Sequence, residues 1–407
     1  MRLFAATLAC SLALAPFAHA QSILRVEPTG AGGAYLDIQA AIDAASPGDL
    51  VLVETGTYPG FSVSGKGLTV AADSGAVVEV DDFSGIGSVP FGSEVVLSGM
   101  TITFEPALFQ MFPFDALAIG NCQGHVLLQD MTIVGEPQAV RVFDSESVAF
   151  VNCDLTSVND GGAGIFIQDS HVFLHDSRIQ AGVGSAGTPF GGSGFEGGAG
   201  IDVLAGSTAL VVGCDVTGGM GGPPYPFHPT AGAADGGPAV RAGGLPGEVP
   251  PVLAYDSTFT GGPGGVDGTL VADDGPEYFG PPGAFVQLPN TARRILLDPV
   301  VRAGEQSSKT FTGDPFDFLW HIIAIQAGDV VVYLPDVLGA IHPGGSPFFF
   351  KYRGLLDVTG QKTLNITLSA TGLEYVPIYE QALMYSVNDG FVASNPRMVA
   401  FLDASVP

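Results

Sequence analysis

The chain has 407 residues, of which 58 are Gly and 30 are Pro, and its 41 acidic against 14 basic residues give a formal net charge of −27. This acidity argues against binding to nucleic acid or to anionic membrane surfaces, because both select basic patches. Charged residues make up only 14% of the chain, which excludes a coiled coil, while a hydrophobic content of 46% is ample for a core. We therefore expect a globular protein without a nucleic-acid partner.

The first twenty residues have the pattern of a secretory signal peptide. Arg2 precedes a run rich in Ala and Leu, and Ala18-His19-Ala20 is a small-x-small cleavage site. We expect residues 1–20 to be removed on export, which makes the protein secreted or attached to the cell surface. The run is short for a membrane span, and no other segment is long and apolar enough to cross a bilayer.

A short amphipathic helix is predicted at the start of the mature chain. Its apolar face has the spacing i, i+3, i+4, i+7 and consists of Ile38, Ala41, Ile42 and Ala45. Pro47-Gly48-Asp49 ends this helix, and Leu50–Val53 begins a strand. Because a repeat fold needs a cap at its open apolar end, we expect the helix to be that cap.

A unit of about 23 residues then repeats. Each unit has an apolar triplet followed two residues later by an anchor, and the anchors are Gly99, Asp130, Cys153, Asp176, Cys214 and Asp256. Short β-branched strands at this spacing fit the coils of a parallel β-helix, in which equivalent positions stack roughly 4.8 Å apart. Gly-rich insertions at 182–200 and 218–238 lengthen two units, and we expect them to be exposed, mobile loops at one corner.

The segment from Ile38 to Ala45, with Pro47-Gly48-Asp49 and Gly56-Thr57-Tyr58, resembles the opening motif of secreted right-handed parallel β-helix proteins. These form the pectate-lyase-like superfamily in its broad sense, and the resemblance covers Ser22–Leu288. It implies the fold but no single activity, since the superfamily includes lyases, glycoside hydrolases, esterases and proteins without known catalysis.

Beyond residue 290 the strands lengthen and alternate, as in Thr363–Leu368, which predicts an antiparallel β-sandwich. This part is similar to a C-terminal module of some secreted bacterial proteins, through Gln381-Ala382 and Ser394-Asn395-Pro396. We thus predict an all-β chain with a signal peptide at 1–20, a parallel β-helix with a capping helix and Gly-rich loops at 21–290, and a sandwich at 291–407. An adhesive, sorting or stabilising role is expected for the sandwich.

Two outward columns of the β-helix are candidate contact surfaces. The polar column offers ligand contacts at Gln129, Asn152, His175 and Tyr255. The apolar column is a stripe of Val96, Leu127, Phe150, Phe173, Val211 and Leu253. The stripe either lies under the Gly-rich loops or the C-terminal domain, or docks a partner or ligand.

A third candidate is the row of Arg141, Asp202 and Arg241, in which Asp202 and Arg241 should be neighbours. An Arg beside a carboxylate on the outer face resembles the site of polysaccharide lyases, where it implies a catalytic base. The alternative is an exposed ion pair. Residues 21–292 hold 30 acidic but only 5 basic residues, which argues against a polyuronate substrate.

The sequence shows no transition-metal spacing, and we expect no cofactor. Calcium is the one cation that Asp-rich loops suit, with Asp154, Asp160 and Asp202 as candidates against simple solvation. The first hypothesis is a structural, adhesive or carbohydrate-contacting protein with a polysaccharide or cell-surface component as partner. The alternative is a polysaccharide lyase or glycoside hydrolase that acts on the outer face of the β-helix.

Overall fold

The computed structural model describes most of the chain after residue 20. The described residues are 21–104, 115–159, 161–188, 192–204, 206–225, 232–243, 252–267, 270–325, 337–339, 341–342, 348–367, 369 and 374–403. The predicted signal peptide at 1–20 and the calcium candidate Asp160 lie outside them.

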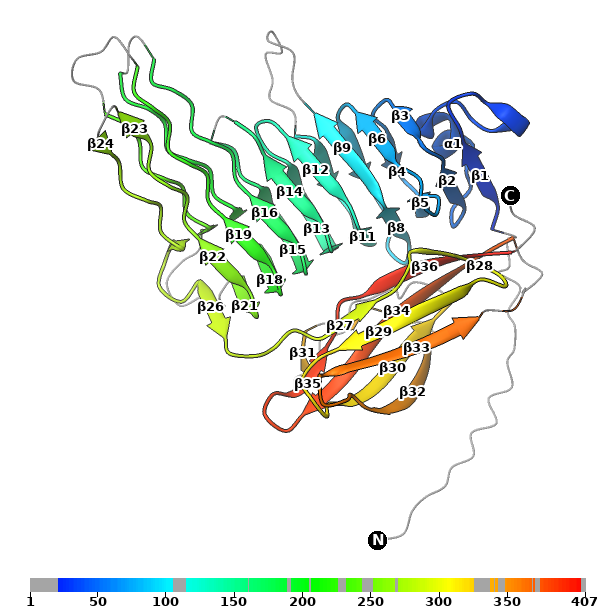
Figure 1. The fold of residues 1–407 in the computed structure, drawn as a ribbon. Helices are drawn as coiled ribbons and strands as arrows, with labels where there is room; N and C mark the ends of the chain where they lie inside the picture. The colour runs from blue at the N-terminus through cyan, green and yellow to red at the C-terminus, as the bar shows by residue number, and fades with distance from the viewer. Residues whose placement is uncertain are drawn as a thin grey trace.

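The chain winds into a right-handed parallel β-helix, as predicted, and each coil contributes strands to three sheets (Figure 1). Sheet 1 contains β4 (Ser62–Ser64), β7 (Ser84–Gly87), β10 (Leu117–Gly120), β17 (Ile201–Val203), β20 (Val240–Ala242) and β25 (Tyr278–Phe279). Sheet 2 contains β1 (Ile23–Val26), β2 (Leu50–Val53), β5 (Leu68–Ala72), β8 (Glu94–Ser98), β11 (His125–Gln129), β18 (Thr208–Val212), β21 (Val252–Tyr255) and β26 (Phe285–Leu288). Sheet 3 contains β3 (Gly56–Tyr58), β6 (Val78–Asp81), β9 (Met100–Phe104), β12 (Thr132–Gly135), β14 (Asp154–Ser157), β16 (Arg178–Gln180), β19 (Asp215–Thr217) and β22 (Thr258–Thr260).

Two long strands join sheets 1 and 2. The first halves of β13 (Val140–Val151) and β15 (Ile165–His175) pair in sheet 1, and their second halves pair in sheet 2. Side chains alternate between the interior and the surface along each strand, and the inward ones stack into one continuous apolar core.

The predicted capping helix is confirmed as α1 (Ile38–Ala44), which closes the N-terminal end of this core. Asp37 begins the helix by accepting a hydrogen bond from the Ala40 N–H at 2.6 Å. The predicted apolar face is buried against the first strands through Ile38, Ala41, Ile42 and Ala45.

The turn between sheets 2 and 3 fixes the register of the coils. Its residues are Gly99, Asp130, Asn152, Asp176, Gly213 and Asp256, and each has a φ between 50° and 74°. They lie in one file because Gln129 pairs with Val151, and Val151 pairs with His175. The predicted file is wrong at two coils, since Cys153 and Cys214 lie one residue further on. Gly, Asn and Asp tolerate this left-handed backbone best, so the turn conformation, not the Cys similarity, sets the register.

The Gly-rich insertions form a two-layered bundle beside the coils (Figure 1). Its outgoing segments, 181–188, 218–225 and 261–267, leave the ends of β16, β19 and β22, and its returning segments, 192–200, 232–239 and 270–277, lead to β17, β20 and β25. Within the third pair of segments, β23 (Val266–Asp267) pairs with β24 (Leu270–Val271). The expectation of exposed loops is wrong for most of the described glycines, which are buried in segments whose backbones are hydrogen-bonded to one another, while the expectation of mobility stays a prediction.

Hydrogen bonding in this Gly-rich bundle repeats every three residues. Gly219 donates to the Gly198 carbonyl at 2.9 Å, and Gly222 donates to the Phe195 carbonyl at 2.8 Å, in both cases from one layer to the other. The N–H of the residue before each donor bonds to a carbonyl of its own layer. The residue after each donor takes part only as an acceptor, through its carbonyl oxygen. A period of three is that of a polyproline-II-type helix, and it explains the Gly-Gly-X triplets of the sequence.

Each position of the triplet has its own steric requirement. A Cβ on Gly219 would lie 1.8 Å from the Gly182 carbonyl oxygen, and a Cβ on Gly237 would lie 2.0 Å from the Gly198 oxygen, so only Gly fits at this position, where neighbouring segments of the same layer approach each other. The third position needs no N–H donor, and it holds Pro223, Pro238, Pro263 and Pro276. The high Gly and Pro content of these segments resembles that of loops, but here it is required by the close packing of the bundle.

The chain after β26 folds as the predicted β-sandwich of two packed sheets. The smaller sheet contains β27 (Arg294–Leu296), β29 (Gln306–Thr312) and β33 (Gln361–Thr367). The larger contains β28 (Val300–Arg302), β30 (Phe318–Ala324), β31 (Val337–Leu338), β32 (Phe348–Leu355), β34 (Tyr375–Ser386), β35 (Gly390–Ala393) and β36 (Arg397–Leu402). Phe311, Leu319 and Phe401 are part of the core between them. The other face of the larger sheet packs on sheet 2 of the β-helix, and Figure 1 shows the sandwich alongside the coils.

Candidate functional site

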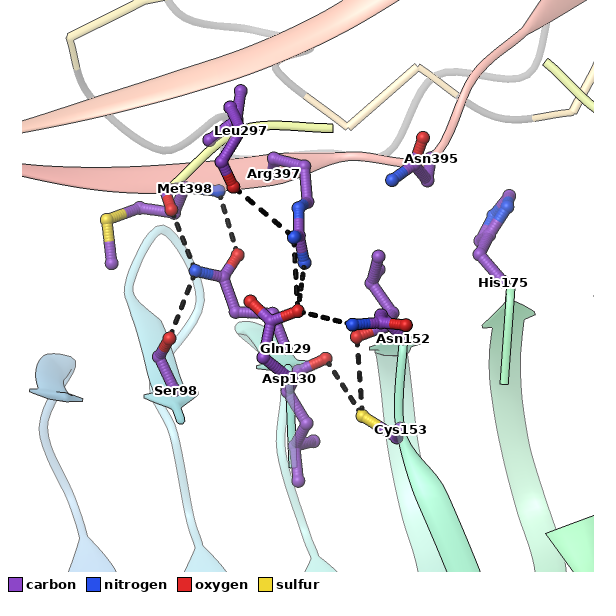
Figure 2. Close-up of polar contacts among 12 residues, drawn as sticks. Ser98, Gln129, Asp130, Asn152, Cys153, His175, Leu297, Asn395, Arg397 and Met398 are labelled. Atoms are coloured by element: carbon purple, nitrogen blue, oxygen red, sulfur yellow. Dashed lines mark hydrogen bonds and ion pairs between the residues drawn. The ribbon is translucent and has the colours of Figure 1, made fainter. Parts of the chain in front are cut away.

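The polar column predicted for ligand contact lies at the interface between the β-helix and the sandwich. Gln129, His175 and Tyr255 are at most 3% exposed. The Gln129 Nε2 donates to the Met398 carbonyl at 2.8 Å, and the Met398 N–H donates to Gln129 Oε1 at 3.0 Å (Figure 2). The fourth candidate, Asn152, belongs to the turn and not to this column. Gln129, His175 and Tyr255 are therefore interface residues, covered by β34, β35 and β36, whereas Asn152 is exposed and donates to Asp130 Oδ1 at 2.7 Å.

The predicted apolar stripe is covered by the same sheet. Its outward members Val96, Leu127, Phe173 and Leu253 pack with Val392 and Met398 of the sandwich. The prediction is wrong for Phe150 and Val211, which point into the β-helix core; Ala149 and Leu210 take their places. The error has the same one-residue origin as the two Cys anchors, because a shift by one residue turns every side chain of a strand to the opposite face.

Three arginines of the sandwich pair with acidic residues that directly follow strands of sheet 2. Arg397 donates through both terminal nitrogens to Asp130 Oδ1 at 3.1 Å, as Figure 2 shows. Arg302 donates to both oxygens of Asp73, at 2.7 and 2.9 Å. A third arginine, Arg294, bonds to Asp176. Part of the acidity of the β-helix is thus neutralised by its own C-terminal domain.

A cluster of titratable groups is buried next to these pairs. The His342 Nδ1 lies 3.4 Å from the His125 Nε2, which in turn lies 3.6 Å from a Glu94 carboxylate oxygen. Burial raises the pKa of Glu94 to about 8 and lowers the pKa of His125 to about 4. Burial, with the Arg294 charge, also lowers the pKa of His175 to about 4. At neutral pH these imidazoles are uncharged, which an apolar interface requires.

The third predicted candidate lies on the open outer face of sheet 1. Strand pairing places Arg141, Phe166, Asp202 and Arg241 in one row on successive coils, as expected from the sequence. The Arg241 Nη1 lies 3.3 Å from Asp202 Oδ2. The Arg141 guanidinium lies 5.4 Å from the centroid of the Phe166 ring, and its Nε lies 2.7 Å from Oδ2 of Asp115, a residue that the sequence reasoning missed. Both arginines are therefore already paired with a carboxylate.

Asp202 is the most unusual member of this row. Its side chain is 13% exposed, and its Oδ1 is buried without a hydrogen-bond partner among the described residues. Burial raises the pKa of Asp202, and the neighbouring Arg241 charge opposes that rise. An unsatisfied buried acceptor typically costs about 1–3 kcal/mol.

Aromatic rings flank the same row. Phe279 pairs with Arg241 on the next coil and is 62% exposed. Phe143 lies beside Arg141 and stacks on Gly120, where a Cβ would meet the Phe143 ring at 2.1 Å. The signal that could have identified Phe143 is its place two residues after Arg141, which puts both side chains on one face.

The two described calcium candidates, Asp154 and Asp202, do not lie together. The Asp154 carboxylate lies 3.7 Å from Arg178 on sheet 3, and Asp202 faces Arg241 on sheet 1. In the described part of the chain, no group of three or more His, Cys, Asp or Glu side chains is placed to hold a metal ion. Nor does any described helix have the length and apolarity needed to cross a membrane.

Comparisons with known proteins find distant structural likenesses, including one to a pectin methylesterase and one to a phage tailspike protein. No protein-family model matches the chain, and no curated protein sequence matches it. The structure is similar to that of pectin methylesterase PemA from Erwinia chrysanthemi, with 12% identity, a TM-score of 0.31, and coverage of 63% of this chain and 92% of that chain. It is also similar to the tailspike protein of an Acinetobacter phage, with 12% identity, a TM-score of 0.23, and coverage of 91% of this chain and 78% of that chain.

Proposed function

We propose that this chain is a carbohydrate-contacting β-helix protein of the cell exterior, and that the outer face of sheet 1 is its contact surface. The observation that carries the proposal is the buried Oδ1 of Asp202 beside Arg241, which has no hydrogen-bond partner among the described residues. A sugar hydroxyl is a donor of the right size for this oxygen, and the Phe166 and Phe279 rings on the same face offer apolar surface for the C–H groups of a sugar ring.

The charge on this face favours neutral sugars. Arg141 and Arg241 already face Asp115 and Asp202, so neither guanidinium is free for the carboxylate of a uronic acid. The net charge of −27 also disfavours the approach of an anionic polymer.

The geometry favours contact over hydrolysis. Asp115 precedes β10 and Asp202 lies on β17, three strand spacings or roughly 14 Å away. Glycoside hydrolysis by a carboxylate pair needs a separation of about 5–9.5 Å. Asp115 and Asp202 are therefore too far apart to act as the carboxylate pair of a glycoside hydrolase.

The test is binding of the full chain to a panel of neutral and acidic polysaccharides, measured by affinity electrophoresis. We expect a neutral polysaccharide to bind, and Phe166→Ala and Arg241→Ala to weaken its binding at least tenfold. Arg178→Ala is the matched control, because it removes the same kind of Arg–Asp pair from sheet 3.

The proposal fails if no neutral polysaccharide binds, or if Arg178→Ala weakens binding as much as Arg241→Ala does. Release of reducing sugar from the same panel measures the enzymatic alternative. If the natural chain released reducing sugar and Arg241→Ala did not, the outer face of sheet 1 would be a catalytic site and not only a contact surface.

A further inference from the structure

A cluster of six aromatic rings lies on the larger sheet of the sandwich. The rings belong to four neighbouring strands, β30, β32, β34 and β35, and we call them the aromatic patch: Phe318, Trp320, Phe350, Tyr352, Tyr385 and Phe391. Trp320, the single Trp of the chain, is at their centre, with ring centroids 5.5 Å from Tyr352 and 5.8 Å from Phe391. Its ring plane lies within 9° of that of Phe350.

Three rings of the aromatic patch are exposed, and the other three, those of Trp320, Tyr385 and Phe391, are half-buried. Phe318 is 40% exposed, Phe350 51% and Tyr352 52%. The strands alternate, so that Leu319 points into the sandwich core, while Phe318 and Trp320 point to the face of the larger sheet that also packs on the β-helix. The rings therefore are not needed to fill the core, and a large exposed apolar patch of this kind marks a contact surface.

The chemistry of the aromatic patch selects its ligand. Its six members include no carboxylate, ammonium or guanidinium group, so it offers ring faces, which carry partial negative charge, and two tyrosine hydroxyls. The C–H groups on one face of a pyranose ring carry partial positive charge and match such ring faces, in the same way that cations do but more weakly. An acidic polymer would instead be repelled by a chain whose net charge is −27.

We propose that the aromatic patch is a second carbohydrate-binding surface, which takes neutral polysaccharide by stacking of sugar rings on Trp320, Phe350 and Tyr352. It belongs to the sandwich, and its argument does not depend on the Asp202 row of sheet 1. A chain with both surfaces would hold a polymer at two places, and it would bind more tightly than through either surface alone.

The test is co-sedimentation of the full chain with an insoluble neutral polysaccharide, together with affinity electrophoresis in soluble ones. Trp320→Ala and Tyr352→Ala should each lower the bound fraction or the affinity at least tenfold. Phe349→Ala is the matched control, because Phe349 lies on the same strand and is 65% exposed but makes no ring contact with the patch. We expect it to bind like the natural chain.

The two surfaces are distinguished by the variants of sheet 1. If Phe166→Ala abolishes binding while Trp320→Ala leaves it unchanged, the patch proposal fails and the sheet 1 proposal stands. If Trp320→Ala abolishes binding while Phe166→Ala leaves it unchanged, the sheet 1 proposal fails and the patch proposal stands. The patch proposal also fails if the natural chain dimerises and Trp320→Ala is monomeric with unchanged glycan binding, because the patch would then bind a second copy. Far-ultraviolet circular dichroism and thermal denaturation of each variant exclude misfolding as the cause of a loss.

Discussion

At the scale of single residues, Gln129 shows how one side chain joins the two parts of the molecule. Its amide bonds to both the N–H and the C=O of Met398, and all of these groups are buried. Gln129→Leu would keep the size of the side chain but leave both backbone groups unpaired. Since each unsatisfied buried group costs about 1–3 kcal/mol, we expect a loss of roughly 2–4 kcal/mol in unfolding free energy, measured by urea denaturation.

The matched control for this change is Ser98→Ala in the same column. Ser98 accepts one hydrogen bond from the Gln129 amide at 3.2 Å, and this bond involves no backbone group of the sandwich. We expect its loss to cost about 1 kcal/mol or less. Equal losses for the two variants would mean that the bonds to Met398 contribute nothing beyond ordinary packing.

We expect Asp202 to lower the stability of the folded chain while it contributes to carbohydrate binding. Because burial raises its pKa in the folded chain, its contribution to stability is fully present below its ordinary pKa and is lost as the pH rises through the folded value. At pH 7 the carboxylate therefore costs stability, and Asp202→Asn should raise the unfolding free energy by roughly 1 kcal/mol while it weakens carbohydrate binding.

Thermal denaturation at pH 7 measures this gain, and Asp154→Asn is its control. The Asp154 pair with Arg178 is half-exposed, so we expect its removal to change stability by no more than about 0.5 kcal/mol. A lower denaturation temperature for Asp202→Asn at pH 7 would show that the Arg241 attraction outweighs the cost of burial.

At the scale of elements, the Gly-rich bundle depends on the close approach of its backbones. Gly219→Ala would place a Cβ 1.8 Å from the Gly182 carbonyl oxygen, inside a layer that is hydrogen-bonded on all sides. We expect the bundle to separate locally, with a loss of about 3 kcal/mol or more. Thermal denaturation measures the loss, and limited proteolysis between β19 and β20 locates it.

Gly232→Ala is the control for this change, because Gly232 also belongs to the bundle but has no atom within 4 Å of its Cβ position. We expect its stability to stay within about 0.5 kcal/mol of the natural chain. If both variants behave alike, glycine is present in the bundle for backbone freedom and not for close packing.

The elements differ in how far the sequence alone predicts them. The capping helix and the coils follow from local periods, so α1 and the row of Arg141, Phe166, Asp202 and Arg241 were predictable. The register at Asn152 and Gly213 was predictable only from backbone conformation, since the turn selects residues that tolerate positive φ. The bundle could have been recognised from its Gly-Gly-X period, which composition alone hides.

The contact residues were harder to predict, because they depend on which distant segments meet. The sequence shows that the column of Gln129 and His175 faces outward, but not that β36 covers it. The aromatic patch combines strands more than 60 residues apart, and its one local signal is the alternation of Phe318 with Trp320 and of Phe350 with Tyr352. Alternating aromatic residues on successive strands are thus a better guide to this surface than charge.

At the scale of the whole molecule, the acidic β-helix and its C-terminal domain form one body through a partly ionic interface. Arg302, Arg397 and Arg294 pair with acidic residues that follow strands of sheet 2, and the side chains of His125, His175, His342 and Glu94 are buried in the same interface. The lowered pKa values of His125 and His175 give a contribution to stability that is present above about pH 6.5 and is lost as the pH falls toward 4. The raised pKa of Glu94 acts in the opposite direction, since its contribution is present below pH 4.5 and is lost as the pH rises toward 8.

Acid should therefore weaken the interface, and His175 allows a direct test. Val151 and Val212 occupy its place on the neighbouring coils, so His175→Val keeps an apolar side chain that the column already accepts. The natural chain should lose about 2 kcal/mol between pH 6.5 and 5 through His175 alone, at about 1.4 kcal/mol per pH unit, and the variant should keep that amount. Urea denaturation at pH 7.5, 6.5 and 5 measures the difference, with the comparison at pH 7.5 reporting the effect of packing. Parallel curves for the two chains from pH 7.5 to 5 would mean that His175 takes up no proton on unfolding, and the interface would then owe its pH dependence to other groups.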